Sequence, residues 1–528
     1  MQPLGRLALI IFEIALLSVL ILATRCANYQ DVFVAGNVYF VDADCYARMT
    51  RAQMVRANPG LIVRHHAFEN FPQGTTPHTT APLDYLIVAL SFLLDPFTAH
   101  ALDLAGEFVS PVLALLGGWF LWWWSRRMKW RYRWVMLILY AISPILVHGT
   151  ELGRPDHQSL LILSVAIAIS AGWSSRTLQS SNLASAWWLT SAAAWALAIW
   201  VSTYEPVVLF VIITVTTLLM DRHAVFGRDR RAGWVLFAVI IAIAFAIERR
   251  VSSFAILLSI GNLKGWGSTI GELAHVSPLN PVWLHWCGYL LLIMPVWIWM
   301  RIRARNEGAS HGRALPVYVL LVVTYFLTIW QVRWGYFFVL IFALALPALL
   351  APIKSGVAVW IAVVLSMFPV LQDWDERIWP NEAQLAGRLE RRIESAQIRD
   401  LALSLQSAEE CPFLAPWWLS PSIAYWSGQP GIAGSAHESL NGIEVSAQFF
   451  LSENLKQVYE ILEKRHVAWV FAYDSDRVAQ NSAAILSEPV PPRPLGRVLY
   501  QTPSQAPTFL IFSTQNPTCK LYRVNVGR

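Results

Sequence analysis

The stretch WVMLILYAISPILVHGTELGRPDHQSLLILSVAIAI, residues 134–169, decides the kind of fold that this sequence can form. Two apolar runs, 132–149 and 157–173, flank a short segment that carries several ionisable residues. A helical membrane crossing needs about 20 consecutive apolar residues, so each run is close to the length of one span. The stretch therefore predicts two membrane helices joined by a short polar turn.

The composition of the whole chain favours the same class of protein. Of its 528 residues, 56% are hydrophobic and 14% are charged, whereas a soluble domain carries about 25% charged residues. Many of the 26 Trp residues stand at the ends of apolar runs, where membrane interfaces favour amphipathic rings. The net charge of +6 could suggest a nucleic-acid partner, but the basic residues lie between apolar runs, where membrane topology explains them.

Eleven apolar segments predict a polytopic α-helical membrane protein of about eleven spans. They are residues 7–24, 100–124, 132–149, 157–173, 184–202, 205–220, 232–247, 282–302, 315–330, 334–350 and 354–371. The first segment resembles a signal peptide. No A-x-A-like cleavage site follows it, so we expect it to remain as a membrane anchor.

Basic residues cluster in three of the predicted connections, and these clusters predict the orientation of the chain. With the N-terminus in the cytoplasm, all three clusters lie on the cytoplasmic side, as the positive-inside rule requires. The clusters are Arg126, Arg127, Lys129, Arg131 and Arg133; Arg222, Arg228, Arg230 and Arg231; and Arg301, Arg303, Arg305 and Arg313. Arg249 and Arg250 fall on the other side, so either the register differs there or they bind an anionic group. We expect a multi-pass protein of the cell inner (plasma) membrane with an extracytoplasmic C-terminal region.

Three regions are expected outside the membrane on that extracytoplasmic side, namely the loops 26–99 and 248–281 and the tail 373–528. The first loop contains an apolar segment, 84–94, that is too short to span and predicts an interfacial helix. The tail predicts a small mixed α/β domain, which follows a transmembrane region, 1–372. The helical and strand-like stretches of the tail are Leu385–Leu405, Val467–Tyr473 and Thr508–Ser513.

The five cysteines leave two interpretations open. If both external regions face an oxidising compartment, Cys26–Cys45 and Cys411–Cys519 are possible disulfides. Free thiols explain the same residues equally well, because sequence alone does not give the connectivity.

A small set of acidic residues lies in the external loops beside predicted membrane boundaries. Asp42 and Asp44 follow the first span, Asp156 stands between two spans, and Glu272 lies in a later loop. Clustered carboxylates need a neutralising cation, and Mg²⁺ and Mn²⁺ prefer oxygen ligands. Arg333, at the outer edge of a later span, carries a guanidinium group that matches phosphate oxygens. The set predicts metal-assisted handling of a phosphorylated lipid.

Each of these residues also has a simpler role open to it. Asp156 stands at a predicted helix start, where an N-cap is a strong alternative. Glu272 can pair with Lys264 or His275, and Arg333 can be an interfacial residue that extends its charge into water.

Two further alternatives concern the metal ligands. Asp42 competes with Asp44 for the same role, and the dipeptide His65-His66 is a weaker candidate for a metal site. The set of acids is a stronger signal than any single member, because one charge-derived topology puts all of them on one side.

The order of these motifs resembles that in the catalytic subunits of oligosaccharyltransferases and their bacterial and archaeal relatives, membrane glycosyltransferases of the GT-C fold. In that family an acid in the first external loop is followed by Tyr and Arg, which Asp44, Tyr46 and Arg51 match. A Pro-Leu-Asp-like segment further along the same loop is matched by Pro82-Leu83-Asp84.

The later motifs of the family follow in the same order. Gly153-Arg154-Pro155-Asp156-His157-Gln158 is similar to its Gly-x-x-Asp-His-His-like motif. Thr269-Ile270-Gly271-Glu272 matches its T-I-x-E motif in full, and Arg333 matches a basic residue at the start of a late span.

The resemblance implies a metal-dependent, inverting glycosyltransferase that uses a polyprenyl phosphate or diphosphate donor at the outer membrane face. It implies that Asp44, Asp156 and Glu272 bind Mn²⁺ or Mg²⁺, with Gln158 where the family usually has a second ligand, His or an acid. It also implies that Asp44 and Glu272 engage the acceptor nucleophile and that Arg333 holds the lipid phosphate.

The tail departs from the family at the motif that reads the acceptor. The family motif W-W-D-x-G recognises the Ser or Thr of an Asn-x-Ser/Thr sequon, and the chain has Trp417-Trp418-Leu419-Ser420-Pro421 instead. Leu419 cannot accept the hydrogen bond that Asp accepts from a Ser or Thr hydroxyl. Trp417 and Trp418 are therefore either acceptor-binding residues or a buried pair. A protein asparagine, a glycan, a lipid and a hydroxyl group all stay open as acceptors.

A transporter or flippase of lipid-linked sugars is the main alternative of a different class. Transporters place ionisable residues near mid-membrane and break helices there, whereas most spans here lack central charges. A structural scaffold, the third class, predicts no metal dependence. We favour the enzyme and expect a lipid-linked sugar donor, a protein or glycan acceptor and the membrane as partners, and no nucleic acid.

Overall fold

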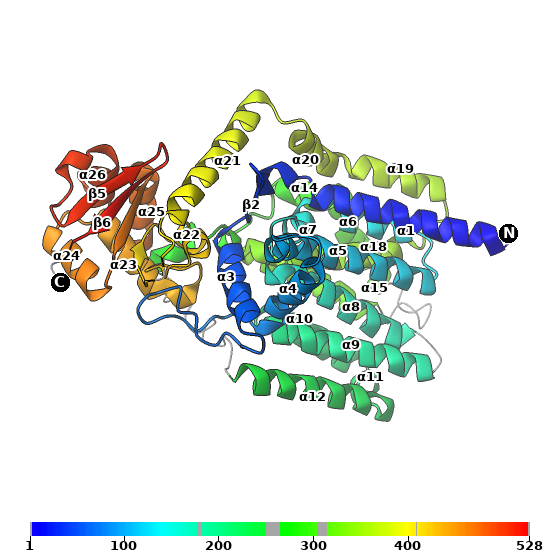
Figure 1. The fold of residues 1–528 in the computed structure, drawn as a ribbon. Coiled ribbons are helices and arrows are strands. Elements are labelled where there is room, and N and C mark those ends of the chain that lie inside the picture. The colour runs from blue at the N-terminus through cyan, green and yellow to red at the C-terminus, as the bar shows by residue number, and fades with distance from the viewer. Residues whose placement is uncertain (1–2, 178–180, 250–263, 304–313, 408, 526–528) are drawn as a thin grey trace.

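Long helices form one part of the molecule, and a small sheet with short helices forms the other (Figure 1). The computed structural model describes residues 3–177, 181–249, 264–303, 314–407 and 409–525. The loop 26–99, named the external loop after its expected location, lies with its helix α3 (Ala43–Ala57) between the two parts (Figure 1). The helix α21 (Glu382–Leu403) leads from one part to the other (Figure 1).

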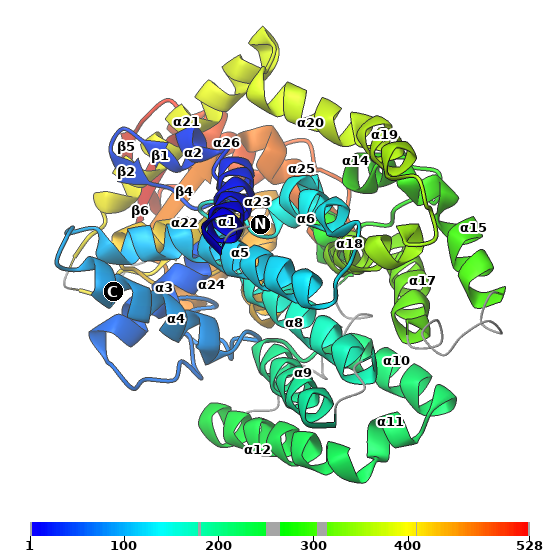
Figure 2. The same ribbon diagram turned by 90° about the vertical axis from the view of Figure 1, so that its right-hand side faces the viewer.

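Among the described residues, six helices are long and apolar enough to cross a membrane. A seventh span results if α19 (Gly356–Ser366) and α20 (Phe368–Ile378), which meet at 44°, are counted as one. Figure 2 shows several of these helices nearly end-on. The six are α1 (Pro3–Arg25), α5 (Ala101–Arg127), α8 (His157–Thr177), α9 (Ser181–Val201), α12 (Arg231–Glu248) and α18 (Gly335–Leu350).

The other predicted spans correspond to shorter helices, so the predicted count of eleven spans is not confirmed. Proline at residue 144 has no N–H to donate, and the predicted span 132–149 accordingly breaks there into two helices. Gly288 adopts a φ of +74°, outside the helical range, and interrupts the predicted span 282–302. These shorter helices are α6 (Arg133–Ile142), α7 (Pro144–His148), α10 (Glu205–Met220), α14 (Val282–Cys287), α15 (Leu290–Arg303) and α17 (Leu315–Trp330).

The first external loop is held together by a buried ion pair. Arg48 Nη1 lies 2.7 Å from Asp84 Oδ1, and Arg51 Nε lies 3.5 Å from Asp84 Oδ2. These contacts join α3 to α4 (Ala81–Leu94), which is the helix predicted for the segment 84–94. Arg51 and Asp84, two motif residues of the family, therefore have a structural role in this loop. The loop also contains α2 (Tyr29–Val32), β1 (Phe33–Val34) and β2 (Asn37–Val38).

The tail forms a four-stranded sheet in the order β3-β4-β6-β5. The strands β3 (Phe413–Leu414) and β4 (Trp469–Tyr473) are parallel, and β5 (Leu510–Gln515) and β6 (Cys519–Val524) pair antiparallel. The predicted helical stretch and both strand-like runs are present. The helices beside the sheet are α22 (Ser420–Ser427), α23 (Leu440–Leu451), α24 (Leu455–Lys464), α25 (Ser475–Leu486) and α26 (Leu495–Gln501).

One hydrophobic cluster runs from the membrane helices into the sheet, so the division into separate domains at residue 373 stays a prediction. All five cysteines are free, and neither predicted disulfide is formed. The remaining short elements are α11 (His223–Phe226), η1 (Arg228–Arg230), η3 (Lys264–Thr269), η4 (Gly271–Leu273), η6 (Val332–Trp334), η7 (His437–Ser439) and η8 (Pro503–Gln505).

Aromatic side chains join the external loop to the tail. The Tyr46 ring lies 5.0 Å from the Trp426 ring, and the Phe40 ring lies 5.7 Å from the Tyr425 ring, both in edge-on geometry. Such pairs add about 0.5–1.5 kcal/mol each beyond the area that they bury. The loop therefore packs against α22 as part of a continuous core.

Glu13, inside the first span, is the counter-ion of the basic connection between α5 and α6. This connection, residues 126–133, contains no acidic residue of its own. The Glu13 carboxylate lies 2.9 Å from Arg126 Nη1 and 2.5 Å from Arg133 Nη2, and it accepts a hydrogen bond from the Trp122 indole. At the far end of the bundle, Arg249 directly follows α12, and Arg250 lies outside the described residues.

Replacing Glu13 by Gln would leave two arginines without their shared anion. We expect the Glu13→Gln protein to lose about 1–3 kcal/mol of stability, because its partners are partly buried. Thermal unfolding of the detergent-solubilised protein measures this loss. Arg6→Gln, an exposed change on the same helix, is the control and should leave the Tm unchanged. An equal Tm for Glu13→Gln and the parent would contradict the structural role of the pair.

Candidate functional site

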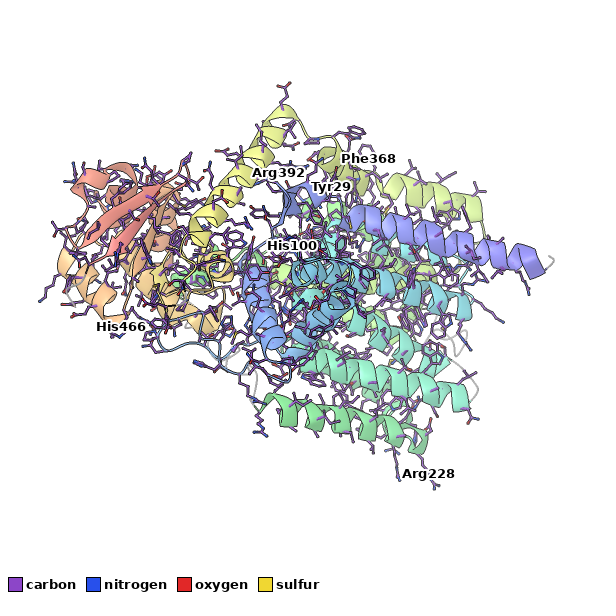
Figure 3. The ribbon with its side chains drawn as sticks, viewed as in Figure 1. Tyr29, His100, Arg228, Phe368, Arg392 and His466 are labelled. Carbon is purple, nitrogen blue, oxygen red and sulfur yellow. The ribbon has the colours of Figure 1, made fainter. Side chains whose placement is uncertain are left out.

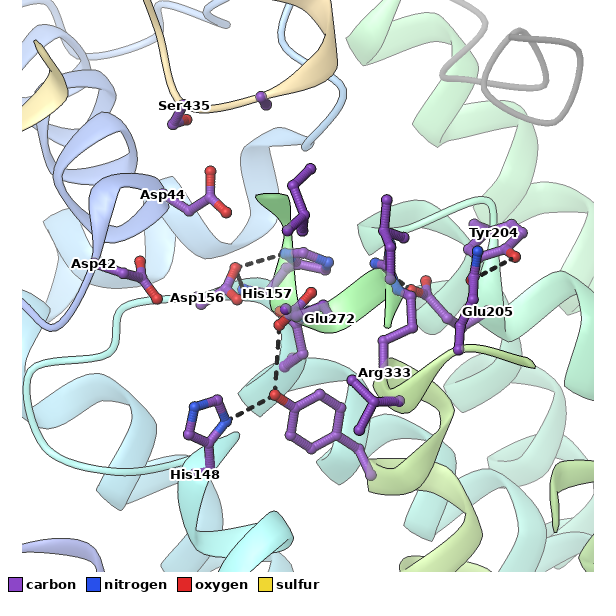
Figure 4. Close-up of a pocket in the computed structure, with 18 of the residues that line it drawn as sticks. Asp42, Asp44, His148, Asp156, His157, Tyr204, Glu205, Glu272, Arg333 and Ser435 are labelled. Carbon is purple, nitrogen blue, oxygen red and sulfur yellow. Dashed lines mark hydrogen bonds and ion pairs between the residues drawn. The ribbon is translucent and has the colours of Figure 1, made fainter. Parts of the chain in front are cut away.

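A cavity of about 810 Å³ lies where the external loop, the ends of the membrane helices and the tail meet. Six of the seven residues predicted for the site line it, and Figure 4 shows how several of them face one another. They are Asp44, Asp156, Gln158, Glu272, Arg333 and Trp417. The seventh, Trp418, instead packs against Tyr473, with the Arg477 guanidinium 5.4 Å from its ring.

Asp42 and Asp44, the two candidates for one metal-binding role, have different environments in the structure. Asp42 caps α3 by accepting the Cys45 N–H (3.0 Å), and its other oxygen lies 2.7 Å from Arg154 Nη1. Asp44, one residue into the helix, faces the cavity (Figure 4). The carboxylate of Asp42 is thus occupied, and that of Asp44 is open to a ligand.

The Asp44 carboxylate lies among other acids. Water reaches it through the cavity, although protein surrounds the group. Burial raises its pKa well above the ordinary value, and the charges of Asp42, Asp156 and Glu272 raise it further, while a hydrogen bond from Ser435 opposes them. Because like charges repel, the site favours any cation that can reach Asp44.

Asp156 and Gln158 stand at the start of α8. Asp156 Oδ1 accepts the His157 backbone N–H at 2.6 Å and lies 2.6 Å from His157 Nδ1. Burial alone would raise the pKa of Asp156, but the pairing with His157 lowers it below the ordinary value. The Gln158 amide lies against the same carboxylate: in one orientation its NH₂ donates to Asp156, and in the other its oxygen faces the carboxylate oxygens.

Glu272 lies in η4, directly after the residues that match T-I-x. It accepts a hydrogen bond from the Tyr336 hydroxyl at 3.4 Å. Burial raises the pKa of Glu272, and the nearby Arg333 opposes that rise. His275 lines the same cavity, and the side chain of Lys264, the other proposed partner, lies outside the described residues.

Arg333 is paired with an acid that the sequence argument missed. Its Nη2 lies 2.5 Å from Oε1 of Glu205, the buried first residue of α10. The Tyr204 ring lies 5.5 Å from the guanidinium carbon. The sequence signal for Glu205 is its position directly before Pro206 at the start of an apolar run. The same pattern is typical of an ordinary helix start, so it does not reveal the pairing with Arg333.

Several histidines also line the cavity without a spacing that would have revealed them. His148 Nδ1 lies 2.8 Å from the Tyr336 hydroxyl, and its Nε2 lies 3.2 Å from Arg154 Nη2. His78 comes from the external loop, His157 from α8 and His437 from the tail. They lie far apart in the sequence, so only the fold brings them to one wall.

The donor atoms on the acidic side are of the chemical kind that a hard divalent cation prefers, but Asp44, Asp156 and Glu272 do not all bring an oxygen within 4.8 Å of the other two. Asp44, Asp156 and Glu272 offer carboxylate oxygens, and Gln158 offers an amide oxygen in one of its two orientations. Oxygen-only donor sets suit Mg²⁺ and Mn²⁺. The raised pKa of Asp44 agrees with this preference, because a cation would relieve the repulsion that raises it.

Replacing Asp44 by Asn removes the carboxyl group whose pKa is raised. A carboxyl with a raised pKa favours the folded state at low pH, and this contribution is lost as the pH rises above the ordinary value of 3.8. In metal-free buffer at about pH 8 we therefore expect Asp44→Asn to melt a few degrees above the parent, and the difference to vanish near pH 4.

Asp42→Asn is the matched control for this measurement. It breaks the contact with Arg154 and should lower the Tm. A lower Tm for Asp44→Asn than for the parent at about pH 8 would show that Asp44 has a stabilising partner and would contradict the electrostatic description of the site.

Solved structures of two membrane glycosyltransferases resemble the fold of the whole chain. No protein-family model and no curated protein sequence matches it. The archaeal oligosaccharyltransferase AglB from Archaeoglobus fulgidus, in complex with an inhibitory peptide and a dolichol-phosphate, superimposes with a TM-score of 0.68 at 15% identity, over 89% of this chain and 70% of that chain. A second AglB structure, with Zn and sulfate, gives a TM-score of 0.66 at 12% identity, over 97% and 73%.

ArnT from Cupriavidus metallidurans, bound to undecaprenyl phosphate, superimposes with a TM-score of 0.62 at 14% identity, over 98% of both chains. At these identities the likeness concerns the fold, and it agrees with the resemblance that the motifs predicted. The chain therefore has the GT-C fold of these membrane glycosyltransferases.

Proposed function

We propose that the protein is a membrane glycosyltransferase that transfers a sugar or oligosaccharide from a polyprenyl phosphate or diphosphate to an acceptor at the outer face of the cell inner membrane. The observation that carries this proposal is the convergence of Asp44, Asp156 and Glu272 on one cavity that also holds Arg333. Carboxylates on one side and a guanidinium on the other match the two halves of a phosphate-leaving reaction.

The donor half of the reaction uses the basic side of the cavity. Arg333 binds phosphate oxygens of the lipid, since its planar group can donate two parallel hydrogen bonds, and Glu205 holds the guanidinium in place. A dolichol-phosphate in AglB and an undecaprenyl phosphate in ArnT support a polyprenyl phosphate as the lipid.

The acidic side is assigned to the metal and the acceptor. Asp44, Asp156, Gln158 and Glu272 would hold Mn²⁺ or Mg²⁺, which when bound neutralises charge on the phosphate that leaves. Asp44 and Glu272 orient the acceptor nucleophile and accept the proton that it loses. The nucleophile forms a bond to the anomeric carbon while the bond to the phosphate oxygen breaks, and the electron pair leaves with the phosphate.

Loss of any one of the three acids is expected to abolish most of this activity. We expect Asp44→Ala, Asp156→Ala and Glu272→Ala each to lower transfer at least ~100-fold in a membrane assay with a lipid-linked sugar and Mn²⁺ or Mg²⁺. Glu390→Ala, an exposed acid on α21, is the control and should retain full transfer. Intact transfer in all three site variants would contradict the catalytic proposal.

The same preparation separates the enzyme from a transporter. Movement of the lipid-linked sugar across vesicle membranes without covalent transfer, in both the parent and the acid variants, would favour a flippase. Metal dependence of the transfer reaction, and its loss on chelation, would exclude a scaffold.

The acceptor is the less constrained half of the proposal. Trp417 and Trp266 line one end of the cavity with their rings 5.8 Å apart in edge-on geometry. Asn481 accepts the Trp417 indole N–H at 2.9 Å and so orients the ring. The face of an indole ring suits the apolar face of a sugar as well as a peptide, and Leu419 offers no acceptor for a sequon hydroxyl. A glycan or lipid acceptor therefore remains the alternative to a protein asparagine.

Substitution of Trp417 tests the acceptor side separately from the donor side. We expect Trp417→Ala to raise the KM for the acceptor about tenfold, as loss of an aromatic anchor commonly does, and to leave donor binding unchanged. Trp417→Phe should be milder. Trp379→Ala, whose ring is 75% exposed after α20, is the control. Assays with sequon peptides and with oligosaccharides in parallel identify the acceptor class, and an unchanged acceptor KM would contradict the assignment of Trp417.

A further inference from the structure

Three side chains outside the acidic set form a compact group on another part of the cavity wall. His78 belongs to the first external loop, and His437 and Glu438 belong to η7 in the tail. One potential ligand atom from each of them lies within 4.8 Å of the other two. Among the described residues, no other group of three or more His, Cys, Asp or Glu side chains is as compact.

The distances within this group match those between ligands of one metal ion. His78 Nδ1 lies 3.0 Å from Glu438 Oε2, and His437 Nδ1 lies 3.4 Å from the same oxygen. Tetrahedral zinc, with bonds of about 2.0–2.1 Å, separates its ligand atoms by roughly 3.3–3.5 Å. Small side-chain movements would therefore suffice to enclose an ion.

We propose that His78, His437 and Glu438 form a second metal site, selective for Zn²⁺, that fastens the first external loop to the tail. Two imidazole nitrogens and one carboxylate are a donor set that zinc accepts, with a fourth position left for water. Both imidazoles line the cavity, which can supply that water. To bind zinc through Nδ1, His78 and His437 must be neutral and carry their ring proton on Nε2, while Glu438 binds as the carboxylate.

The two metal sites differ in the chemistry of their donors. The proposed ligands on the acidic side offer oxygen atoms, which suit Mg²⁺ or Mn²⁺, whereas imidazole nitrogen suits zinc. The rings of His78 and His157 lie 6.2 Å apart, but His157 Nδ1 is occupied by Asp156. His157 thus separates the two groups, so each can be filled and tested without the other.

Other contacts also join the loop to the tail, so variants of the proposed ligands should still fold. Glu69 accepts a hydrogen bond from the Ser439 hydroxyl at 2.8 Å. Arg465 Nη1 donates to the Phe71 carbonyl at 2.8 Å. The metal would add to a junction that already exists, and its removal should lower the Tm without unfolding the protein.

Zinc stoichiometry tests the proposal without any transfer assay. The purified full-length protein is stripped with a chelator, dialysed against Zn²⁺ in excess Mg²⁺ and analysed for bound metal. We expect one equivalent of zinc, a higher Tm with zinc than without it, and at least ~10-fold weaker binding in His437→Gln and in Glu438→Gln. Co²⁺ in place of zinc should give the intense visible bands of four-coordinate cobalt with nitrogen ligands, and these bands should be lost in both variants.

Two further variants exclude other positions for the zinc. His65→Ala changes the exposed histidine of the His65-His66 dipeptide on the same loop, and Asp44→Asn changes the acidic set. Both should retain the zinc equivalent. The proposal is overturned if the parent binds no zinc, if His437→Gln and Glu438→Gln bind it like the parent, or if the zinc is lost in His65→Ala or Asp44→Asn. None of these results depends on whether the protein transfers sugar.

Discussion

The guanidinium of Arg154 holds two acid-bearing segments of the chain against each other, and the geometry of the site depends on it. Its Nη1 lies 2.7 Å from Asp42 at the start of α3, and its Nε lies 3.2 Å from Glu151. Asp156 follows two residues later in the same turn. By pairing with Asp42, Arg154 fixes the start of the helix that carries Asp44, while its own backbone sets the position of Asp156. The guanidinium and the backbone of Arg154 thus position both Asp44 and Asp156.

Charges of both signs line the cavity. Arg154 lies among the acids, whereas Arg333 lies near Glu272 and has Glu205 as its own counter-ion. Burial raises the pKa of Asp44, and the charges of the neighbouring acids raise it further, whereas Arg333 has its own buried counter-ion. An anionic ligand beside Arg333 and a cation beside Asp44 would each lower the electrostatic energy of the site.

The sequence predicted those parts of the protein that depend on local pattern. Apolar length located the long helices among the described residues. The position of acids beside apolar runs gave a set of candidates, and the ordered motifs narrowed it to Asp44, Asp156 and Glu272. The sequence could not predict pairs that only the fold creates. Glu205 meets Arg333 although they are 128 positions apart in the sequence, and Glu13 meets Arg126 from another helix. Span length was also overestimated where proline or glycine breaks a helix that is continuously apolar, as at Pro144 and Gly288.

The wall of the cavity that carries Ser435, Ala436 and His437 comes from a part of the chain made long after Asp44. A ribosome that has produced the whole helical bundle has therefore still not produced a closed cavity. Until the tail is made, the acids lack the wall that Ser435, Ala436 and His437 supply. Closure of the cavity is thus one of the last events in the synthesis of this chain, and a chain that stops before residue 435 would carry Asp44, Asp156 and Glu272 without the wall that encloses them.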